Sequence, residues 1–127
     1  MIDALLSFTN GISREWDVAI RKVPECLCWE EERKALSYLG EGWVGEEAVA
    51  LALYCFLRYP DSYEKVVIRG ANTNGDSDSI ACVAGSISGA FWGIDAIPPE
   101  WVTKIEKSTY LEDLEQRLAT KKEAING

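Results

Sequence analysis

The chain has 127 residues, 13 of them basic and 21 acidic, so its formal net charge is −8 at pH 7. This balance opposes binding to nucleic-acid phosphates or to an anionic membrane surface, and we expect neither as a partner. The absence of histidine excludes Ser-His-Asp and Cys-His catalysis within the chain, and also any His-ligated zinc site. The length fits one domain over residues 1–127, and no apolar run reaches the ~20 residues that cross a membrane.

The N-terminus and the cysteines indicate where the chain works. Met1-Ile2-Asp3 lacks the basic segment of a secretory signal peptide, so we expect a cytoplasmic protein. The four cysteines do not form the paired CxxC sets of a zinc module. Cys55 and Cys82 lie in apolar helical patterns and are predicted to be buried free thiols. For Cys26-Leu27-Cys28, plain reduced thiols and a redox or metal role are both open.

The first third of the chain gives the weakest pattern. It predicts a helix from Ser13 to Val23, capped by Ser13 and ended before Pro24. A second helix is predicted from Trp29 to Tyr38. Gly40-Glu41-Gly42 then breaks the helical pattern.

The segment from Gly45 to Arg58 predicts a central helix. Glu46 and Glu47 stand in its first turn, where carboxylates complement the helix dipole, although a metal-ligand role for them is the alternative. The ten residues that follow are apolar on almost every side, which indicates a helix covered all round. After Tyr59-Pro60, a capping box of Asp61 and Glu64 predicts another helix, which begins at residue 62 or 63 and ends near residue 71.

Small residues then recur every four positions, at Ala81, Gly85, Gly89 and Gly93. At helical spacing they fall near one face, and a ridge without side chains lets a neighbouring backbone approach closely. Pro98-Pro99 marks a turn and the first turn of another helix, and a last amphipathic helix carries Leu111, Leu114 and Leu118. Strand-like alternation is weak and confined to residues 65–68, so the fold is predicted to be all-α.

An acidic turn precedes the small-residue helix. Asp76, Asp78 and Ser79 place two carboxylates and a hydroxyl at positions i, i+2 and i+3. Hard oxygen ligands gathered at a tight turn suit Mg²⁺, Mn²⁺ or Ca²⁺. The other interpretation is that the aspartates cap the helix by accepting backbone N–H bonds. The spacing alone leaves a metal site and a helix cap both open.

Two strings resemble the C-terminal half of the ADP-ribosylglycohydrolase family: Gly42-Trp43-Val44-Gly45-Glu46-Glu47-Ala48 and Gly75-Asp76-Ser77-Asp78-Ser79-Ile80-Ala81. The match continues through residues 84–90 and 97–101 and is nearly continuous over residues 38–118. This combination is far more specific than a D-x-D motif, and it favours the metal site. The resemblance implies an all-α helical bundle around a pair of Mg²⁺ or Mn²⁺ ions, which removes ADP-ribose from modified side chains or related acceptors.

The resemblance also implies roles for single residues. The implied metal ligands are Asp76, Asp78 and Ser79, with the serine in place of the family's Thr or Ser hydroxyl ligand. Gly75 would let the backbone turn tightly beside the ions. Glu41 and Trp43 belong to a stretch that lines the adenosine side of the cleft, and the indole would stack on adenine, unless it is a buried core tryptophan. No residue of the chain is identified as catalytic.

Part of the family pattern is missing. Family members are usually more than twice as long, and their N-terminal half carries an acidic catalytic residue and a Thr/Ser-Asp-Asp motif. No Asp-Asp pair occurs in this chain. We therefore expect a bundle truncated at its N-terminal side that supplies half of a dinuclear site, with a homo-oligomer or a complementary N-terminal-half polypeptide as partner. The alternative is a non-catalytic helical module or inactive fragment whose Asp-rich turn only caps a helix.

Overall fold

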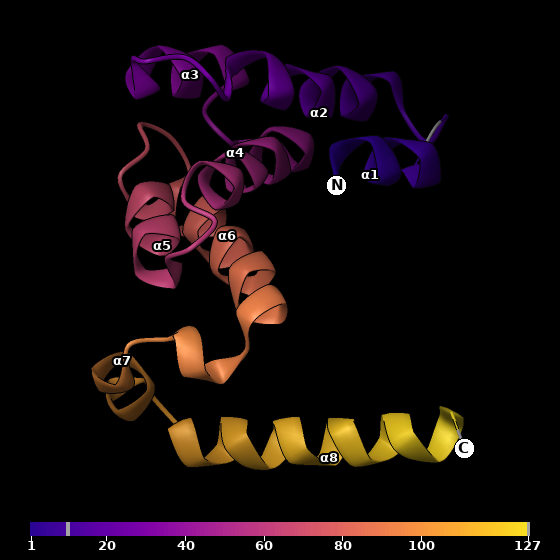
Figure 1. Ribbon diagram of the computed structural model, residues 1–127, viewed down its shortest axis with the longest axis vertical. Helices are drawn as coiled ribbons and strands as arrows, with labels where there is room; N and C mark the ends of the chain where they lie inside the picture. The colour runs from indigo at the N-terminus through magenta and orange to yellow at the C-terminus, as the bar shows by residue number, and fades with distance from the viewer. Residues whose placement is uncertain (10, 127) are drawn as a thin grey trace. The chain divides into compact units, whose positions relative to one another are not determined.

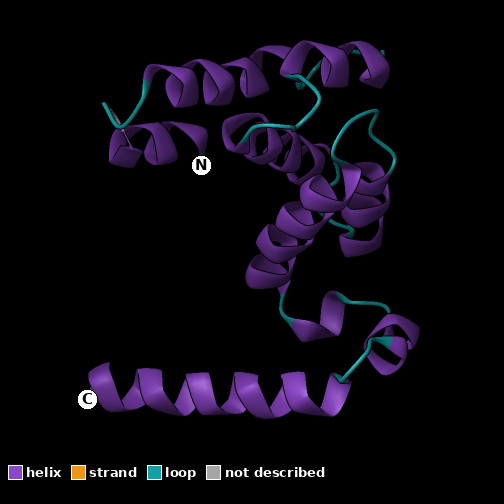
Figure 2. Cartoon of the chain, turned by 180° about the vertical axis from the view of Figure 1, so that it is seen from behind, coloured by secondary structure: helices purple, strands orange, loops and turns teal. Residues whose placement is uncertain are grey.

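The computed structural model describes residues 1–9 and 11–126, with side chains described up to Lys121. These residues form eight α-helices, one 3-10 helix and no strand, so the prediction of an all-α fold is confirmed (Figure 1, Figure 2). Two compact units are distinguished, Met1–Ala96 and Ile97–Gly127, and a single domain over the whole chain stays a prediction. In the described part of the chain, no helix is both long enough and apolar enough to cross a membrane.

The helices of the first unit are α1 (Ile2–Thr9), α2 (Arg14–Cys26), α3 (Glu32–Leu39), α4 (Gly45–Arg58), α5 (Tyr63–Ala71) and α6 (Ser77–Trp92), followed by the 3-10 helix η1 (Ile94–Ala96). In the second unit, α7 (Pro99–Lys104) packs on α8 (Ser108–Asn126). Pro99 occupies the first turn of α7, as predicted. Helix α1 was not predicted.

Helix α4 is the centre of the first unit. It contacts α2 and α3 on one side and α5 and α6 on the other (Figure 1). Every residue from Ala48 to Phe56 is buried except the half-buried Val49. Burial of apolar surface stabilises by about 25 cal/mol per Å², so this helix is the main source of core stability. The predicted bounds and all-round burial of this helix are confirmed.

Three predictions about helix ends were wrong. Helix α2 continues through Pro24 because its apolar face extends to the buried Cys26. Helix α3 begins at Glu32 rather than at Trp29, since the chain first makes a turn after α2. Helix α5 is capped by Ser62, whose Oγ accepts the N–H of Lys65 at 3.3 Å, and not by the predicted Asp61 box.

The cysteines are free thiols, as predicted, but one burial prediction failed. Cys82 is exposed, because it lies on a face of α6 that the core does not cover. Burial raises the pKa of Cys26 to about 11 and that of Cys55 to about 12, so both thiols stay protonated at neutral pH. Cys28 is exposed, and the contrast with its buried neighbour Cys26 favours plain reduced thiols over a joint redox or metal role.

The small-residue face of α6 packs closely on α5, as the sequence predicts. A Cβ atom added at Gly70 of α5 would lie 2.9 Å from the Cα of Ala81. On α6, a Cβ atom at Gly85 would lie 3.2 Å from the Tyr63 hydroxyl oxygen. Gly93 differs from the other small residues, because it ends α6 with a positive φ of 79° and a Cβ atom added there would meet nothing within 4 Å. The two helices therefore approach closely where Gly70 meets Ala81, whereas Gly85 makes room for the side chain of Tyr63.

Glu32 ties three helices together. Its carboxylate lies 3.3 Å from Arg58 Nε at the end of α4 and 3.3 Å from Arg69 Nη1 on α5, and it also accepts the Tyr59 hydroxyl. Partial burial alone raises the pKa of this carboxylate, but the three hydrogen bonds outweigh burial, and the net effect lowers the pKa. Since the Glu32 side chain is only 21% exposed, solvent screens these contacts less than it screens surface ion pairs.

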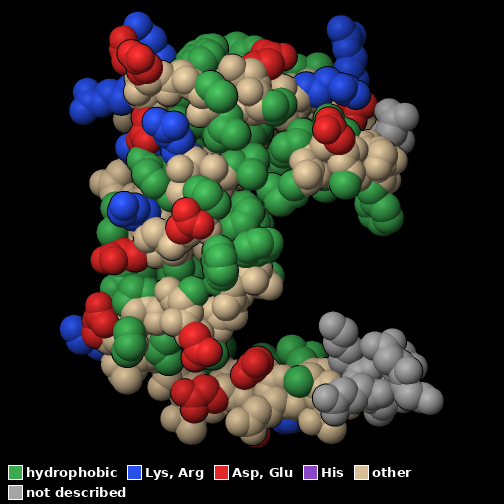
Figure 3. All heavy atoms as spheres, viewed as in Figure 1, with side chains coloured by type: hydrophobic (Ala, Val, Ile, Leu, Met, Phe, Trp, Pro, Cys, Tyr) green, Lys and Arg blue, Asp and Glu red, His purple; other side chains and the backbone are tan. Residues whose placement is uncertain are grey.

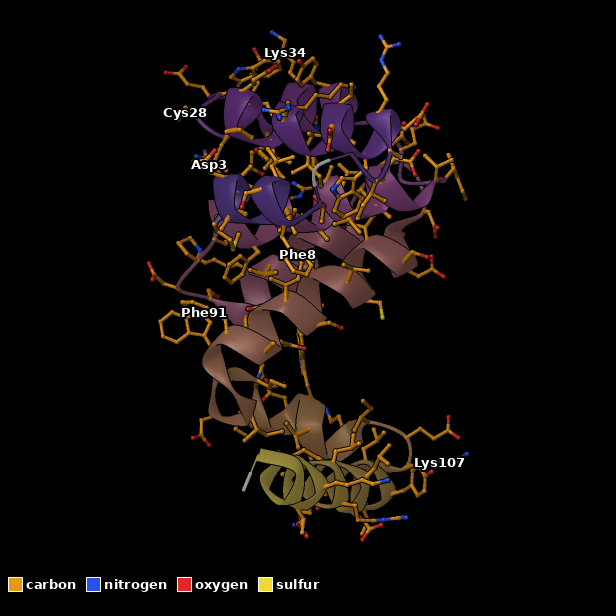
Figure 4. All side chains as sticks on the ribbon, turned by 90° about the vertical axis from the view of Figure 1, so that its right-hand side faces the viewer. Asp3, Phe8, Cys28, Lys34, Phe91 and Lys107 are labelled. Carbon is orange, nitrogen blue, oxygen red and sulfur yellow. The ribbon has the colours of Figure 1, made fainter. Side chains whose placement is uncertain are left out.

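Large apolar side chains also remain exposed on the first unit. Phe8 is 88% exposed and Phe91 is 65% exposed, and the Phe91 ring projects outward from the end of α6 (Figure 4). Hydrophobic side chains gather on the face formed along α4 and α6 (Figure 3). Apolar surface of this kind marks an interaction site in many proteins.

Replacing Gly70 with alanine should lower the free energy of unfolding by about 1–3 kcal/mol, because the new methyl group meets the α6 backbone. This cost exceeds the gain of up to about 1 kcal/mol in helix propensity. Gly45→Ala is the matched control, since a Cβ atom there meets nothing within 4 Å. Urea unfolding measures both variants. Equal stability of the two would contradict the close approach of α5 and α6.

Glu32→Gln should lower the free energy of unfolding at pH 7 by about 1–3 kcal/mol. Because the folded-state pKa of Glu32 is lowered, its carboxylate stabilises the fold above its ordinary pKa, and this contribution is lost as the pH falls through the folded-state value. The difference between parent and variant should therefore shrink towards zero in urea titrations as the pH falls through the folded-state pKa of Glu32. Glu31→Gln, at an exposed neighbour, is the control, and a pH-independent difference would contradict the assignment.

Candidate functional site

The loop between α3 and α4 docks onto the turn that precedes α6. The Asp76 N–H donates to the Glu41 carbonyl oxygen at 2.9 Å. A Cβ atom at Gly75 would lie 1.7 Å from that same oxygen, so only glycine permits the contact. Gly42 packs against Ile80 in the first turn of α6, where an added Cβ atom would lie 2.7 Å from Ile80 Cδ1. Gly75 is thus required for a close approach of two backbones, and not only for the tight turn expected from the sequence.

Glu47 holds the loop from the other side. Its Oε2 atom accepts the backbone N–H groups of Glu41 and Gly42, each at 3.1 Å. Gly40, with a φ of 125°, lies directly on this carboxylate, since an added Cβ atom would be 2.4 Å from Glu47 Cδ. Such charge-assisted hydrogen bonds are stronger than neutral ones. Glu47 therefore positions the loop. This role disfavours the alternative in which Glu47 is a metal ligand. The sequence signal was a glutamate in a first helical turn after a Gly-x-Gly break.

Trp43 lies on the surface beside this loop. It is 68% exposed, and its Nε1–H donates to Glu41 Oε2 at 3.0 Å. The alternative of a buried core tryptophan is therefore wrong for this chain. An exposed indole that is held by its N–H keeps a face available for a flat ligand, and adenine stacking stays a prediction.

The two aspartates of the acidic turn lie close together. The pKa of Asp78 lies below its usual range, first because its side chain shares a hydrogen bond with Asp76 and then because of backbone N–H groups. One of these is the Ser79 N–H, 3.0 Å from Asp78 Oδ1. Asp76 stands at the N-cap position, but its side chain makes no capping hydrogen bond. The capping interpretation is thus wrong for Asp76, whose carboxylate contacts its neighbour instead.

The six residues singled out in the sequence therefore lie in one connected region. Contacts run from Trp43 to Glu41, from Glu41 to the turn at Gly75 and Asp76, and from there to Asp78. Ser79 follows in the first turn of α6 and is exposed. The residues come from the α3–α4 loop, from the α5–α6 turn and from α6 itself.

The donor chemistry of the turn fits a hard divalent cation in kind. Two adjacent carboxylates and one hydroxyl are the oxygen ligands that Mg²⁺, Mn²⁺ and Ca²⁺ prefer. In number they fall short, because no group of three or more His, Cys, Asp or Glu side chains gathers within the described residues. A cation at Asp76 and Asp78 would need further ligands from water, substrate or another polypeptide.

Fold and site together define an all-α protein with oxygen donors gathered at the start of a helix rich in small residues. A sequence model described as ADP-ribosylglycohydrolase matches residues 1–126. The chain belongs to the ADP-ribosylglycohydrolase family, so the resemblance seen in the sequence is confirmed.

Individual relatives agree with this family. ADP-ribosylhydrolase ARH3 of Homo sapiens is 32% identical over 117 residues, which cover 83% of this chain and 32% of the relative. ARH3 of Danio rerio is 34% identical over 95 residues, or 67% of this chain and 26% of the relative. ADP-ribosylarginine hydrolase Tri1 of Pseudomonas putida (strain GB-1) is 36% identical over 58 residues, which cover 46% of this chain and 16% of the relative. No solved structure matches the chain. The chain spans about a third of the length of the human and mouse ARH3 relatives.

Glu47→Ala should release the loop, because it removes the acceptor of two backbone N–H groups. Amide hydrogen exchange at Glu41 and Gly42 is expected to accelerate about tenfold or more, since hydrogen bonds to charged groups are worth about 1.5–3 kcal/mol. Glu46→Ala, in the same helical turn, is the control. Unchanged protection at residues 41 and 42 in Glu47→Ala would show that the loop is held by other contacts.

Proposed function

We propose that the chain takes part in hydrolysis of the N- or O-glycosidic bond between ADP-ribose and a modified acceptor. Family membership supports this proposal, as do the relatives, which are an ADP-ribosylhydrolase and an ADP-ribosylarginine hydrolase. The observation that carries it is the docking of Glu41 on Gly75 and Asp76, which joins the adenosine-side loop to the acidic turn.

In this proposal Asp76, Asp78 and Ser79 hold a divalent cation, Mg²⁺ or Mn²⁺, as one half of a two-ion site. When bound, such a cation supplies positive charge that orients ribose hydroxyls and water. The residues of the chain itself position the substrate. Trp43 offers an exposed face to adenine, and Glu41 fixes that indole by accepting its N–H. Departure of the acceptor from the anomeric carbon gives oxocarbenium character, so positioning beside that carbon accelerates the reaction.

We also propose that the complete site forms on assembly. The donor set at the turn is short of ligands, and large apolar side chains of the first unit are exposed. A homo-oligomer or a complementary polypeptide with the rest of the family fold would supply further ligands and cover the exposed apolar side chains. The free, partly buried thiols suit a reducing compartment, and we propose the cytoplasm.

A non-catalytic helical module is the second candidate function. It is favoured by the short ligand set at the acidic turn within the described residues. In that case the loop and turn would bind ADP-ribose or a partner without turnover. Metal binding alone does not separate the two candidates, whereas turnover does.

Mn²⁺ or Mg²⁺ should raise the thermal stability of the purified chain, by about 2.7 kcal/mol at 100 times Kd. Asp76→Asn and Asp78→Asn should abolish this shift, because each replaces a carboxylate ligand by a neutral amide of the same shape. Asp95→Asn, in η1 at the far end of α6, is the control. A shift that persists in both turn variants would contradict the assigned ligands.

Release of ADP-ribose from an ADP-ribosyl-arginine substrate, with each metal, then tests catalysis. Metal-dependent release that is lost in Asp76→Asn supports the hydrolase. A metal shift without release favours the non-catalytic module or a site that awaits its partner. Absence of both the metal shift and the release of ADP-ribose would contradict the proposed function.

A further inference from the structure

A polar pocket of about 490 Å³ lies beside the Glu41 loop, outside the acidic turn. Its walls come from α3, from the start of the α3–α4 loop and from the segment that ends α5. Besides Glu41, the polar lining residues are Arg33, Ser37, Arg69, Asn72, Thr73 and Asn74. The volume suits a small molecule, and the described lining contains no aromatic side chain on which a base could stack.

Two arginines and one carboxylate, that of Glu41, line the pocket, so the formal charge of its lining is positive on a chain whose net charge is −8. Arg69 is held in place, because its Nη1 lies 3.3 Å from Glu32 Oε2 and its Nη2 donates to the Asn72 carbonyl oxygen at 2.5 Å. Arg33 is exposed, and no ion pair is formed by it within the described residues. One guanidinium is therefore fixed and the other is available to a ligand.

Neutral donors complete the lining. The side chains of Ser37 and Asn74 make no hydrogen bond within the part of the chain that is described, so a hydroxyl and an amide are available. The Thr73 hydroxyl donates to the Gly70 carbonyl oxygen at 3.1 Å, so Thr73 Oγ1 can only accept a hydrogen bond from a ligand. Glu41 supplies the one carboxylate among the described lining residues, and it already accepts the indole N–H of Trp43.

This combination selects the chemistry of the ligand. A cation is disfavoured by two guanidinium groups, and a flat aromatic ligand finds no stacking partner. Arginine forks and hydroxyl or amide donors match the oxygens of a phosphoryl group. We propose that this pocket binds a phosphate-bearing small molecule through Arg33 and Arg69, at a site separate from Asp76 and Asp78.

Two sources share this phosphoryl chemistry: the diphosphate of an ADP-ribosylated substrate, and a free phosphate compound. The pocket reaches Glu41 and Asn74, which lie on either side of the loop-to-turn contact. A ligand there would touch the same loop that carries Trp43. The inference does not rest on the proposed hydrolysis, because the pocket requires no metal.

Calorimetric titration of the purified chain with inorganic pyrophosphate, in EDTA, tests the proposal. Binding should weaken at least about tenfold in Arg33→Gln, because a charge-assisted contact is lost. It should stay unchanged in Lys34→Gln, a neighbouring exposed cation on α3 that pairs with Glu31 and is labelled in Figure 4. Asp76→Asn should also bind normally, which separates this site from the metal ligands. Ser37→Ala gives a second, milder variant.

Competition identifies the source. Displacement of pyrophosphate by ADP-ribose would support the pocket and assign it to the substrate. Binding of pyrophosphate in the presence of saturating ADP-ribose would support it and assign it to a free phosphate compound. Absence of pyrophosphate binding, or equal binding in parent and Arg33→Gln, would overturn the proposal and leave the proposed hydrolysis untouched.

Discussion

The candidate site depends on one backbone contact, the hydrogen bond from the Asp76 N–H to the Glu41 carbonyl oxygen. It exists because Gly75 has no Cβ atom and lets the two backbones touch. A single hydrogen bond contributes only about 1 kcal/mol net, so it cannot hold two loops together by itself. The two loops lead into α4 and α6, which pack on each other in the core. The contact therefore forms because the packing of α4 on α6 brings the two loops together.

Side-chain contacts also tie the surroundings of the site to this core. Glu47 reaches back from the first turn of α4 to hold the loop. Glu32, at the start of α3, connects that helix to the end of α4 and to Arg69 on α5. The close packing of α5 on α6 then fixes the turn between them. Every segment that borders the candidate site or the polar pocket beside it is thus anchored to α4 directly or through one neighbour.

The helices with strong periodicity could be predicted, and the tertiary contacts could not. The bounds of α4 followed from its apolar composition and its flanking Glu46 and Tyr59, because these are local signals. Helix α1 and the passage of α2 through Pro24 depend on packing against the rest of the unit, which no local pattern contains. The metal-ligand candidates came from spacing and family resemblance. The roles of Gly75 and Glu47 emerged only when distant segments were placed together.

The electrostatics of the turn bear on the proposed sharing of a metal site between two polypeptides. Asp76 and Asp78 stand at the N-terminus of α6, where the helix dipole carries partial positive charge. That partial charge repels a cation held beside it, whereas the lowered pKa of Asp78 comes first from the Asp76 side chain and then from backbone N–H groups. Two carboxylates and a hydroxyl leave much of a six-ligand shell unfilled. Further carboxylates from a partner would supply both the missing ligands and the missing negative charge. Under the proposed function, metal affinity at Asp76 and Asp78 would therefore depend on assembly with a partner that supplies carboxylates.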